Sequence, residues 1–262
     1  MIAGEGRLPF EVASRMDTPP LVCAMGTHEP EGLDVDLFFS IERLVPFLRH
    51  ITAQQINRIV LVGAVNRPRI EPSHFDPETA ALVPGMLAAL QGGDDAALRW
   101  IISLIEDFGI EVVGVADLAP HLLAQGGAMS TRAPTAAEEA DAARGTAILA
   151  ALSPVDVGQG CAVASGLCLG VEAIYGTDAL LADLSTQRSL REPQSGGVLI
   201  KRAKVGQDLR ADLPTIGPGT IVGARQAQLT GICLQEGHVL ILDREKTLAD
   251  ADEAGIALWS VP

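Results

Sequence analysis

Short apolar runs and amphipathic segments alternate along the first part of the chain. The run at 59–63 is uninterrupted (Ile-Val-Leu-Val-Gly), which is typical of a strand buried on both faces. The segment 96–108 instead repeats Leu and Ile at the spacing of one helix face. Such alternation predicts a parallel sheet with helices packed on it. We therefore expect strands at 1–3, 21–25, 59–63 and 111–115 and helices at 8–15, 41–50 and 96–108, with a kink or late start at Pro46.

The second part of the chain continues the α/β pattern after an interval rich in Gly, Ser, Thr and Pro. That interval, 125–135, has the composition of a linker. Ser165-Gly166 separates two short apolar runs and predicts a hairpin. Beyond the linker we expect helices at 136–152, 179–184, 220–227 and 244–254 and strands at 161–164, 167–171, 197–201, 231–234, 239–242 and 257–261. The predicted fold class is α/β, with two α/β domains joined by a linker: 1–132, Rossmann-like with a mainly parallel sheet, and 133–262, the catalytic domain.

Composition and charge narrow the class of protein. Hydrophobic residues make up 48% of the chain but aromatic residues only 3%, so Ala, Val, Leu and Ile must form the core. The net charge of −14 argues against a nucleic-acid partner, because phosphate backbones need a basic face. The four cysteines have no C-x-x-C spacing, which favours buried thiols in a reducing compartment. No signal-like segment and no apolar run of about 18 residues is present, and we expect a cytoplasmic protein.

The most charged stretch, 201–220, has no hydrophobic period and is predicted to be mostly loop. Its charged residues include Lys201, Arg202, Lys204, Asp208 and Asp212. A helix is expected to begin after Gly217, and its first backbone N–H groups would point back at the loop. Cations, carboxylates and a helix N-terminus suit a phosphate held with a divalent metal. A solvated, salt-bridged surface loop is the alternative.

Two other segments of the first domain are candidate ligand contacts. Gly4 and Gly6 lie between an expected strand and helix, as in a nucleotide-binding loop, although the glycine fingerprint is incomplete. A nicotinamide-dependent oxidoreductase would also need an acid about 20 residues further on, where Glu29 is a poor match. Asn66 and Arg67 follow the expected strand at 59–63, at the end where open α/β sheets bind ligands. A turn Asn and a surface Arg are the alternative.

Acidic residues at element ends have both a structural and a metal-binding interpretation. Glu172 ends an expected strand and Asp178 begins an expected helix, so the two could hold Mg²⁺ through oxygen ligands. Thr177 or Asp178 is equally well placed to cap that helix. Asp94 and Asp95 predict an N-cap and a favourable dipole contact at the start of the helix at 96–108, with a ligand role as the alternative.

Taken in order, the motifs resemble a known family, the I-type UDP-2,3-diacylglucosamine pyrophosphatases of lipid A biosynthesis. The resemblance covers nearly the whole chain and is carried by IAGEGRLP, VGAVNRP, GDDAALR, DVGQG, GVEAIYGTDALL and KRAKVGQDLRADLPTIGPGTI. It implies a Mg²⁺-dependent hydrolase, with Mn²⁺ as the alternative metal. Such an enzyme cleaves UDP-2,3-diacylglucosamine to UMP and 2,3-diacylglucosamine 1-phosphate (lipid X), with water attacking the α-phosphorus. A homodimer with transient contact at the inner membrane surface is also expected.

The resemblance also suggests roles for particular residues. Asp212 occupies the position of the family's essential Asp and would ligate Mg²⁺ or orient the attacking water. Lys204, with Lys201, would place positive charge on a pyrophosphate oxygen. The expected catalytic residues are thus Asp212 and Lys204, and the expected metal ligands are Asp212 and Asp178. The expected substrate contacts are Gly4, Gly6, Asn66, Arg67, Gln159, Thr177, Lys201, Thr215 and Gly217.

Two positions depart from the family pattern. Glu5 occupies the middle of the first glycine loop, where relatives usually have Gly, and its carboxylate would disfavour a close phosphate. Ala164-Ser165 stands where relatives often have an acid before the glycine. Two other functions therefore remain open: a non-catalytic nucleotide- or lipid-binding protein on the same scaffold, and the nicotinamide-dependent oxidoreductase.

Overall fold

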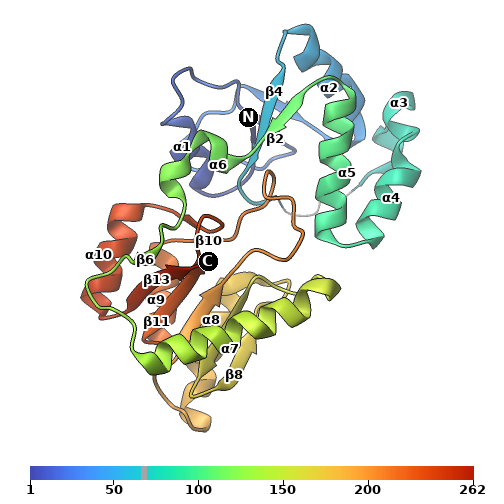
Figure 1. Cartoon of the computed structure of the whole chain (residues 1–262). Coiled ribbons are helices and arrows are strands. Elements are labelled where there is room, and N and C mark those ends of the chain that lie inside the picture. Colours follow the sequence, from blue (N-terminus) through green and yellow to red (C-terminus); the bar gives the residue numbers. More distant parts are fainter. Residues whose placement is uncertain (66–69) are drawn as a thin grey trace. The chain divides into compact units, whose positions relative to one another are not determined.

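Two separate sheets organise the chain in the computed structural model, which describes residues 1–65 and 70–262 (Figure 1). Unit 1 comprises Met1–Pro120 and Asp208–Asp212, and unit 2 comprises His121–Gln207 and Leu213–Pro262. The composition-based boundary after residue 132 lies inside unit 2 as the contacts define it. None of the helices in the described residues has the length and hydropathy needed to cross a bilayer.

Unit 1 contains a five-stranded parallel sheet, which confirms the Rossmann-like interpretation. Its strands are β1 (Ile2–Ala3), β2 (Cys23–Met25), β3 (Leu37–Phe39), β4 (Arg58–Val62) and β5 (Glu111–Val113), in the order β3-β2-β1-β4-β5. All four pairings are parallel. The order reverses between β1 and β4, so the loops after these two strands meet at the topological switch point, where doubly wound sheets bind ligands.

The helices of unit 1 are α1 (Leu8–Ala13), α2 (Leu44–Ala53), α3 (Pro77–Ala80), α4 (Val83–Gln91), α5 (Asp94–Asp107) and α6 (Val115–Leu118). Two of them, α2 and α5, bury apolar side chains in one core with the strands. Pro46 lies in the first turn of α2, after a 3₁₀ turn, which confirms the late start, because a first-turn residue needs no N–H. The prediction of an Asp N-cap on α5 is wrong. Gly93 takes that position, and Asp94 and Asp95 lie in the first turn, where the helix dipole favours acids.

Unit 2 contains a six-stranded mixed sheet with the order β6-β13-β11-β9-β7-β8. Three central strands, β9 (Val198–Lys201), β11 (Gly231–Gln235) and β13 (Ala257–Val261), are parallel. The predicted hairpin is confirmed as β7 (Gly160–Ala164) and β8 (Leu167–Val171), and β7 runs antiparallel to β9. A separate parallel pair joins β10 (Thr215–Ile216) to β12 (Leu240–Ile241).

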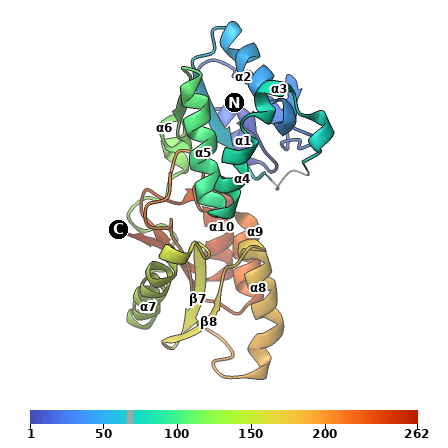
Figure 2. The same cartoon turned by 90° about the vertical axis from the view of Figure 1, so that its right-hand side faces the viewer.

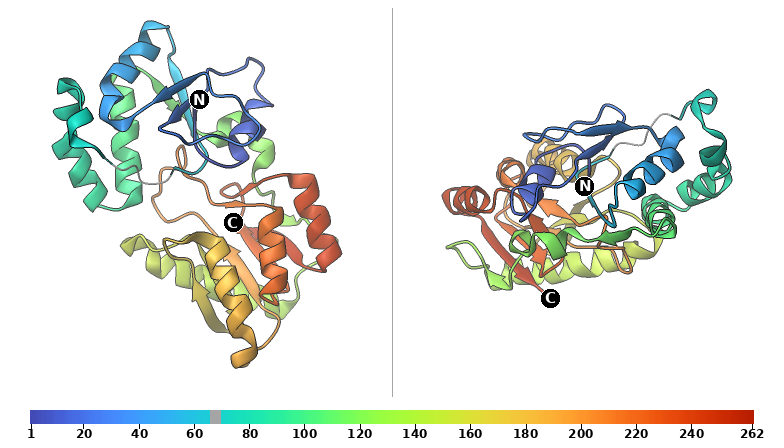
Figure 3. Two further views of the ribbon diagram at one scale, coloured as in Figure 1. Left: turned by 180° about the vertical axis from the view of Figure 1, so that it is seen from behind. Right: turned by 90° about the horizontal axis from the view of Figure 1, so that it is seen from above.

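Helices cover both faces of the unit 2 sheet. The helix α7 (Ala136–Leu152) packs on one face, against Cys161, Ile200 and Cys233 (Figure 2). The other face is covered by α8 (Gly176–Gln187), α9 (Pro218–Gln226) and α10 (Arg244–Ala254), which lie side by side (Figure 3). The predicted side-chain cap of α8 is wrong, because Tyr175 is the N-cap residue and forms no side-chain cap bond.

The interval at 125–135 is hydrogen-bonded into unit 2 along much of its length. Its strand β6 (Gly127–Ala128) pairs antiparallel with β13. Ser130 Oγ accepts from the Leu258 backbone N–H at 2.7 Å, and the Thr131 N–H donates to Asp252 at 2.6 Å. Small polar side chains that looked like linker composition therefore fasten this segment to the edge of the sheet.

Three of the four cysteines are buried, as expected, but Cys168 is exposed on the hairpin. All four lie in the described part of the chain and none forms a disulfide. Burial raises the pKa of the Cys161 and Cys233 thiols to about 12, so both are inert at neutral pH.

Candidate active site

The charged stretch begins with a buried ion pair at the end of β9. Lys201 is only 4% exposed, and its ammonium donates to Glu172 Oε2 at 2.6 Å and to Thr177 Oγ1 at 2.5 Å. The Thr177 hydroxyl in turn donates to Glu172 Oε2 at 2.6 Å. These three groups, the Lys201 cluster, bring the ends of β8 and β9 and the first turn of α8 together.

Two glycines of the D-V-G-Q-G motif make room for this cluster. A Cβ on Gly160 would lie 2.7 Å from Glu172 Oε2, and one on Gly158 would lie 2.1 Å from the Glu172 carbonyl oxygen. Gly158 also has a φ of +60°, which L-residues with side chains rarely adopt. The sequence therefore places glycine where the Glu172 segment must come closest to the preceding loop.

Lys204 is held by a second ion pair on the same side of unit 2. Its ammonium is bonded to Asp156, and its side chain is 15% exposed against 30% for that of Asp156. The loop around it is tied to the D-V-G-Q-G loop by two backbone bonds, from the Val205 N–H to Ser153 Oγ and from the Arg202 N–H to the Gln159 carbonyl. Lys204 is thus fixed in place with a charged group, and two of its three N–H donors are left for other acceptors.

Segment 208–212 of the charged stretch belongs to unit 1. Asp208 receives two hydrogen bonds from the Arg210 guanidinium, at 3.0 and 2.7 Å, and Arg210 also reaches Glu106 at 2.6 Å. The Arg210 hydrogen bonds lower the pKa of Asp208 despite its partial burial. Asp212 ends this segment and is partly exposed, while Ala211 packs on the unit 1 core.

Thr215 and Gly217 lie where the stretch returns to regular structure. The Thr215 hydroxyl donates to the Leu213 carbonyl at 3.0 Å. Gly217 is the N-cap residue of α9, and its N–H donates to Thr220 Oγ1 at 3.2 Å. The prediction of a helix starting here is confirmed, with Pro218 in its first turn.

The glycine loop of unit 1 is closed by backbone contacts at the switch point. The Glu5 N–H donates to the Ala64 carbonyl at 2.7 Å, and a Cβ on Gly4 would lie 2.3 Å from that same oxygen. Gly6 has a φ of +86°. The Glu5 carboxylate contacts His28 Nδ1 at 2.6 Å. Gly4 is therefore required for close approach of the chain to itself, whatever ligand the loop contacts.

The structure brings some of the predicted residues together. Thr177 and Lys201 share the Lys201 cluster, and Gln159 lies beside it in the loop bonded to Arg202. Asp178 is exposed in the first turn of α8. Gly4, Gly6 and Asp212 belong to unit 1, whereas the remaining described candidates belong to unit 2. Asn66 and Arg67 lie outside the described residues.

Carboxylates for a metal are dispersed in this structure. Residues 1–65 and 70–262 contain no group of three His, Cys, Asp or Glu side chains arranged to hold an ion. The expected Glu172–Asp178 pair is altered, because Lys201 neutralises Glu172. No described residue forms a hydrogen bond or ion pair with the Asp178 carboxylate. A Mg²⁺ ion keeps several waters and takes one or two carboxylates plus substrate phosphates, and that modest donor set fits what the chain offers.

Sequence reasoning missed several charged partners. Asp156 lay inside a recognised motif, and its position before two glycines was the available signal. No sequence signal indicated the Glu5–His28 contact, since the two residues are 23 apart in sequence. Arg132 and Glu138 were also missed. They form a bidentate pair at 2.6 and 3.0 Å beside a cavity of about 620 Å³ in unit 2.

Glu138 is buried and fully hydrogen-bonded. Burial alone would raise its pKa, but hydrogen bonds from Arg132, Thr135 and Thr230 outweigh this and lower the pKa to about 2. The Thr135 N–H and the Glu138 carboxylate complete a capping box at the start of α7. This arrangement fastens the chain before α7 to the sheet and accounts for the charged pair without a ligand.

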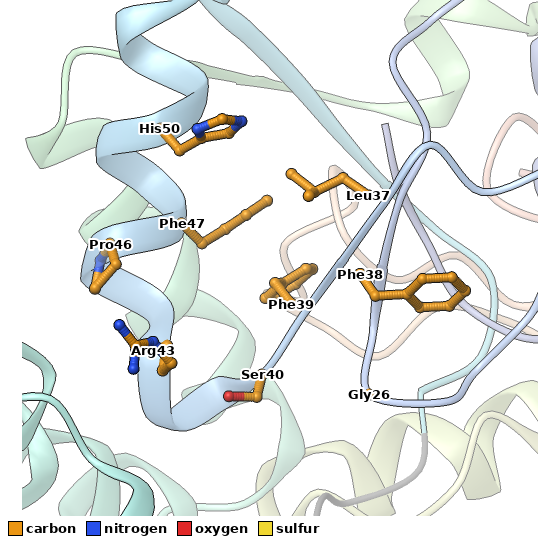
Figure 4. A pocket seen from close by; sticks show the side chains of 9 residues that line it. All are labelled: Gly26, Leu37, Phe38, Phe39, Ser40, Arg43, Pro46, Phe47 and His50. Atoms are coloured by element: carbon orange, nitrogen blue, oxygen red, sulfur yellow. The ribbon is translucent and has the colours of Figure 1, made fainter.

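Unit 1 has an apolar pocket that contains none of the predicted residues. Its volume is about 480 Å³, and β3 and α2 provide most of its wall (Figure 4). Phe39 and Phe47 stack there with ring centroids 3.9 Å apart, and Arg43 and His50 are also among the lining residues (Figure 4). A three-residue strand with an exposed Phe38 gave no alternating pattern from which this pocket could be predicted.

Comparison with known proteins adds independent information. A family model described as "LpxI N-terminal domain" matches residues 1–122, and a second, described as "LpxI C-terminal domain", matches residues 125–259. A curated protein of Caulobacter vibrioides, UDP-2,3-diacylglucosamine pyrophosphatase LpxI, is 32% identical over 273 aligned residues. The alignment covers 100% of this chain and 96% of that protein.

Proposed function

The chain belongs to the LpxI family, and from this we propose that it is a UDP-2,3-diacylglucosamine pyrophosphatase of lipid A synthesis. The observation that carries the proposal is the full-length match, with both domain types present in order. The proposed products are UMP and 2,3-diacylglucosamine 1-phosphate. Water attacks the α-phosphorus, the bond from that phosphorus to the bridging oxygen breaks, and the lipid phosphate leaves with the electron pair.

Lys204 is the cation that we assign to the pyrophosphate. Its pairing with Asp156 orients the ammonium while leaving N–H donors for phosphate oxygens. Negative charge grows on the bridging oxygen as the bond breaks, and a fixed positive charge stabilises that change. We assign Lys201 a positioning role, because its buried ammonium already donates hydrogen bonds to Glu172 and Thr177. It would hold in place the loop that carries Asp178.

Asp212 and Asp178 are the carboxylates that we assign to the metal and the water. Asp212, in unit 1, would accept a proton from the attacking water or be a metal ligand, and Asp178, in unit 2, would be an oxygen ligand for a metal. When bound, Mg²⁺ would offset the charge of the pyrophosphate and lower the pKa of water. A cytoplasmic location and a homodimer stay predictions.

The test is UMP release from UDP-2,3-diacylglucosamine in detergent micelles, with Mg²⁺ and with EDTA. Asp212→Asn is expected to lower kcat by about 10²–10³ with little change in KM, because general-base and charge contributions act in the transition state. Asp178→Asn is compared with Asp183→Asn, an exposed acid further along the same helix. Hydrolysis in ¹⁸O-water is expected to place the label in UMP.

Two results would count against the proposal. Label in the lipid product would move the attack to the other phosphorus. A folded wild-type protein that binds the substrate but releases no UMP with any divalent metal would favour the non-catalytic binding protein.

A further inference from the structure

Large apolar side chains are exposed on three loops of unit 2. We call these five residues the apolar rim: Val155 (65% exposed), Val157 (38%), Ile174 (78%), Tyr175 (85%) and Val205 (80%). Single exposed apolar residues are common on protein surfaces, but a group of them marks an interaction site. None of the five has a part in the ion pairs described above.

Hydrogen bonds show that the three loops are neighbours. The loop with Val155 and Val157 is bonded to the loop with Val205 through Ser153 and Asp156. The first loop also meets the third, because the Glu172 N–H donates to the Gly160 carbonyl at 2.7 Å. Ile174 and Tyr175 follow Glu172 directly and precede the Thr177 of the Lys201 cluster. The loops that carry the rim are therefore the same loops that carry Lys204 and the Lys201 cluster.

Charges on these loops cancel. Their cations are Lys201, Arg202 and Lys204, and their acids are Asp156, Glu172 and Asp178. Two of the cations are ion-paired to two of the acids. A locally neutral, apolar surface on a chain with a net charge of −14 does not suit a polyanionic partner. Hydrocarbon suits it, and a Tyr beside aliphatic residues is typical of side chains that sit at a membrane–water interface.

We propose that the apolar rim inserts into the surface of a lipid bilayer and so brings unit 2 to membrane-borne substrate. The biological sense of this contact rests on the proposed function, since a two-chain lipid substrate resides in a bilayer. The partner is the hydrocarbon at the lipid surface rather than an anionic headgroup. This differs from electrostatic docking, which a basic surface would give and which salt would weaken.

The test is cosedimentation of the full chain with phosphatidylcholine vesicles, which requires no turnover. Wild type is expected to bind equally at low and high salt, because the contact is apolar. Ile174→Ser, Tyr175→Ser and Val205→Ser are each expected to weaken binding about tenfold, which is the effect of losing one buried apolar side chain. The triple variant is expected to lose binding altogether.

Leu190→Ser is the matched control. Leu190 is 79% exposed, much like Ile174, but it lies beyond the C-terminal end of α8, whereas the rim lies at the N-terminal end. This variant is expected to bind vesicles as wild type does. Vesicles with added phosphatidylglycerol are expected to bind less at low salt and to recover at high salt, as repulsion of the acidic protein is screened.

Three outcomes would overturn the proposal. Wild type that stays in solution with vesicles, or a triple variant that still sediments with them, would remove the lipid contact. A wild-type dimer that dissociates in the triple variant, with no vesicle binding by either, would make the rim a contact between copies. A wild-type protein that releases no UMP would instead contradict the proposed function. Vesicle binding would still test the apolar rim, because cosedimentation requires no turnover.

Discussion

The carboxyl ends of the two sheets are held together in different ways. In unit 1 the loops after β1 and β4 are joined backbone to backbone, through Glu5 and Ala64, and Gly4 allows them to touch. In unit 2 the corresponding region has backbone bonds too, but it also has charged side-chain contacts, the Lys201 cluster and the pair of Lys204 with Asp156. Charged side chains are therefore expected to contribute more to the second arrangement than to the first.

This difference shows where chemistry can reside. A loop closed by backbone contacts has a fixed shape and backbone N–H donors, which suit the binding of a neutral or anionic group of a ligand. A loop organised by charged side chains offers fixed cations, which suit a reaction that redistributes negative charge. In our proposal the fixed positive charge is therefore assigned to unit 2, and the residue assigned in unit 1 is Asp212.

Each unit contains one tryptophan, so the comparison can be tested unit by unit. Trp100 belongs to α5 in unit 1, and Trp259 belongs to β13 in unit 2. In a Trp100→Phe background, urea unfolding followed by fluorescence reports on unit 2, and Trp259→Phe makes it report on unit 1. The free energies of unfolding below refer to the unit in which the change is made.

The largest effect is expected from Lys201→Met in unit 2. Removing the ammonium leaves Glu172 buried without a counter-charge, which typically costs about 3–5 kcal/mol. The measurement is the free energy of unfolding from the Trp259 signal. The double variant Lys201→Met/Glu172→Leu is expected to regain much of the loss, since no charge then remains buried. A single variant within about 1 kcal/mol of wild type would mean that charge does not organise this edge.

The next effect is a pH dependence at Glu138, also in unit 2. Its pKa is about 2 in the folded protein against an ordinary value of 4.5. Because the folded pKa is lowered, the stabilisation is complete above about pH 5 and is lost as the pH falls toward 2. The difference corresponds to about 3 kcal/mol for this buried group.

Comparison of wild type with Glu138→Gln at several pH values isolates this contribution. The two proteins are expected to differ most at pH 7 and to converge as the pH approaches 2, with Trp259 as the reporter. Equal pH dependence in both would show that Glu138 does not stabilise the start of α7 through its charge.

A smaller effect is expected from Gly4→Ala in unit 1. The added methyl group would meet the Ala64 carbonyl at 2.3 Å, and overpacking of this kind costs about 1–3 kcal/mol. The Trp100 signal measures it. Gly219→Ala in α9 is the control, because nothing lies within 4 Å of that position, and it is expected to be neutral or slightly stabilising. Tolerance of alanine at Gly4 would mean that volume does not limit the unit 1 edge.

Much of the regular structure could be predicted from local pattern. The helices α7 and α10 and the strands β8 and β13 have the bounds expected from the sequence. Strong local signals explain this: Thr135 and Glu138 form a capping box at the start of α7, and Gly255 ends α10 with a left-handed residue. By contrast, β3 and β6 have three and two residues, too few for a period to show, and were missed.

The contacts among the candidate site residues could not be predicted from the sequence. Local composition identified the charged loop after β9, and motif order gave the family. That Lys201 is buried could not be predicted, because its partner Glu172 is 29 residues away and meets it only through the pairing of β7 with β8 and β9. The sequence shows where charged residues cluster, whereas the tertiary fold determines which of them form ion pairs with one another.

The smallest effect is expected at a charged contact of the unit 1 loop. Glu5 Oε1 lies 2.6 Å from His28 Nδ1, with side chains 45% and 20% exposed. Exposed pairs of this kind contribute about 0.2–1 kcal/mol, so Glu5→Gln is expected to change the Trp100 transition only slightly. A double-mutant cycle with His28→Gln measures the coupling itself. Coupling above about 2 kcal/mol would show that charge also organises the unit 1 edge, because backbone contacts alone could not account for it.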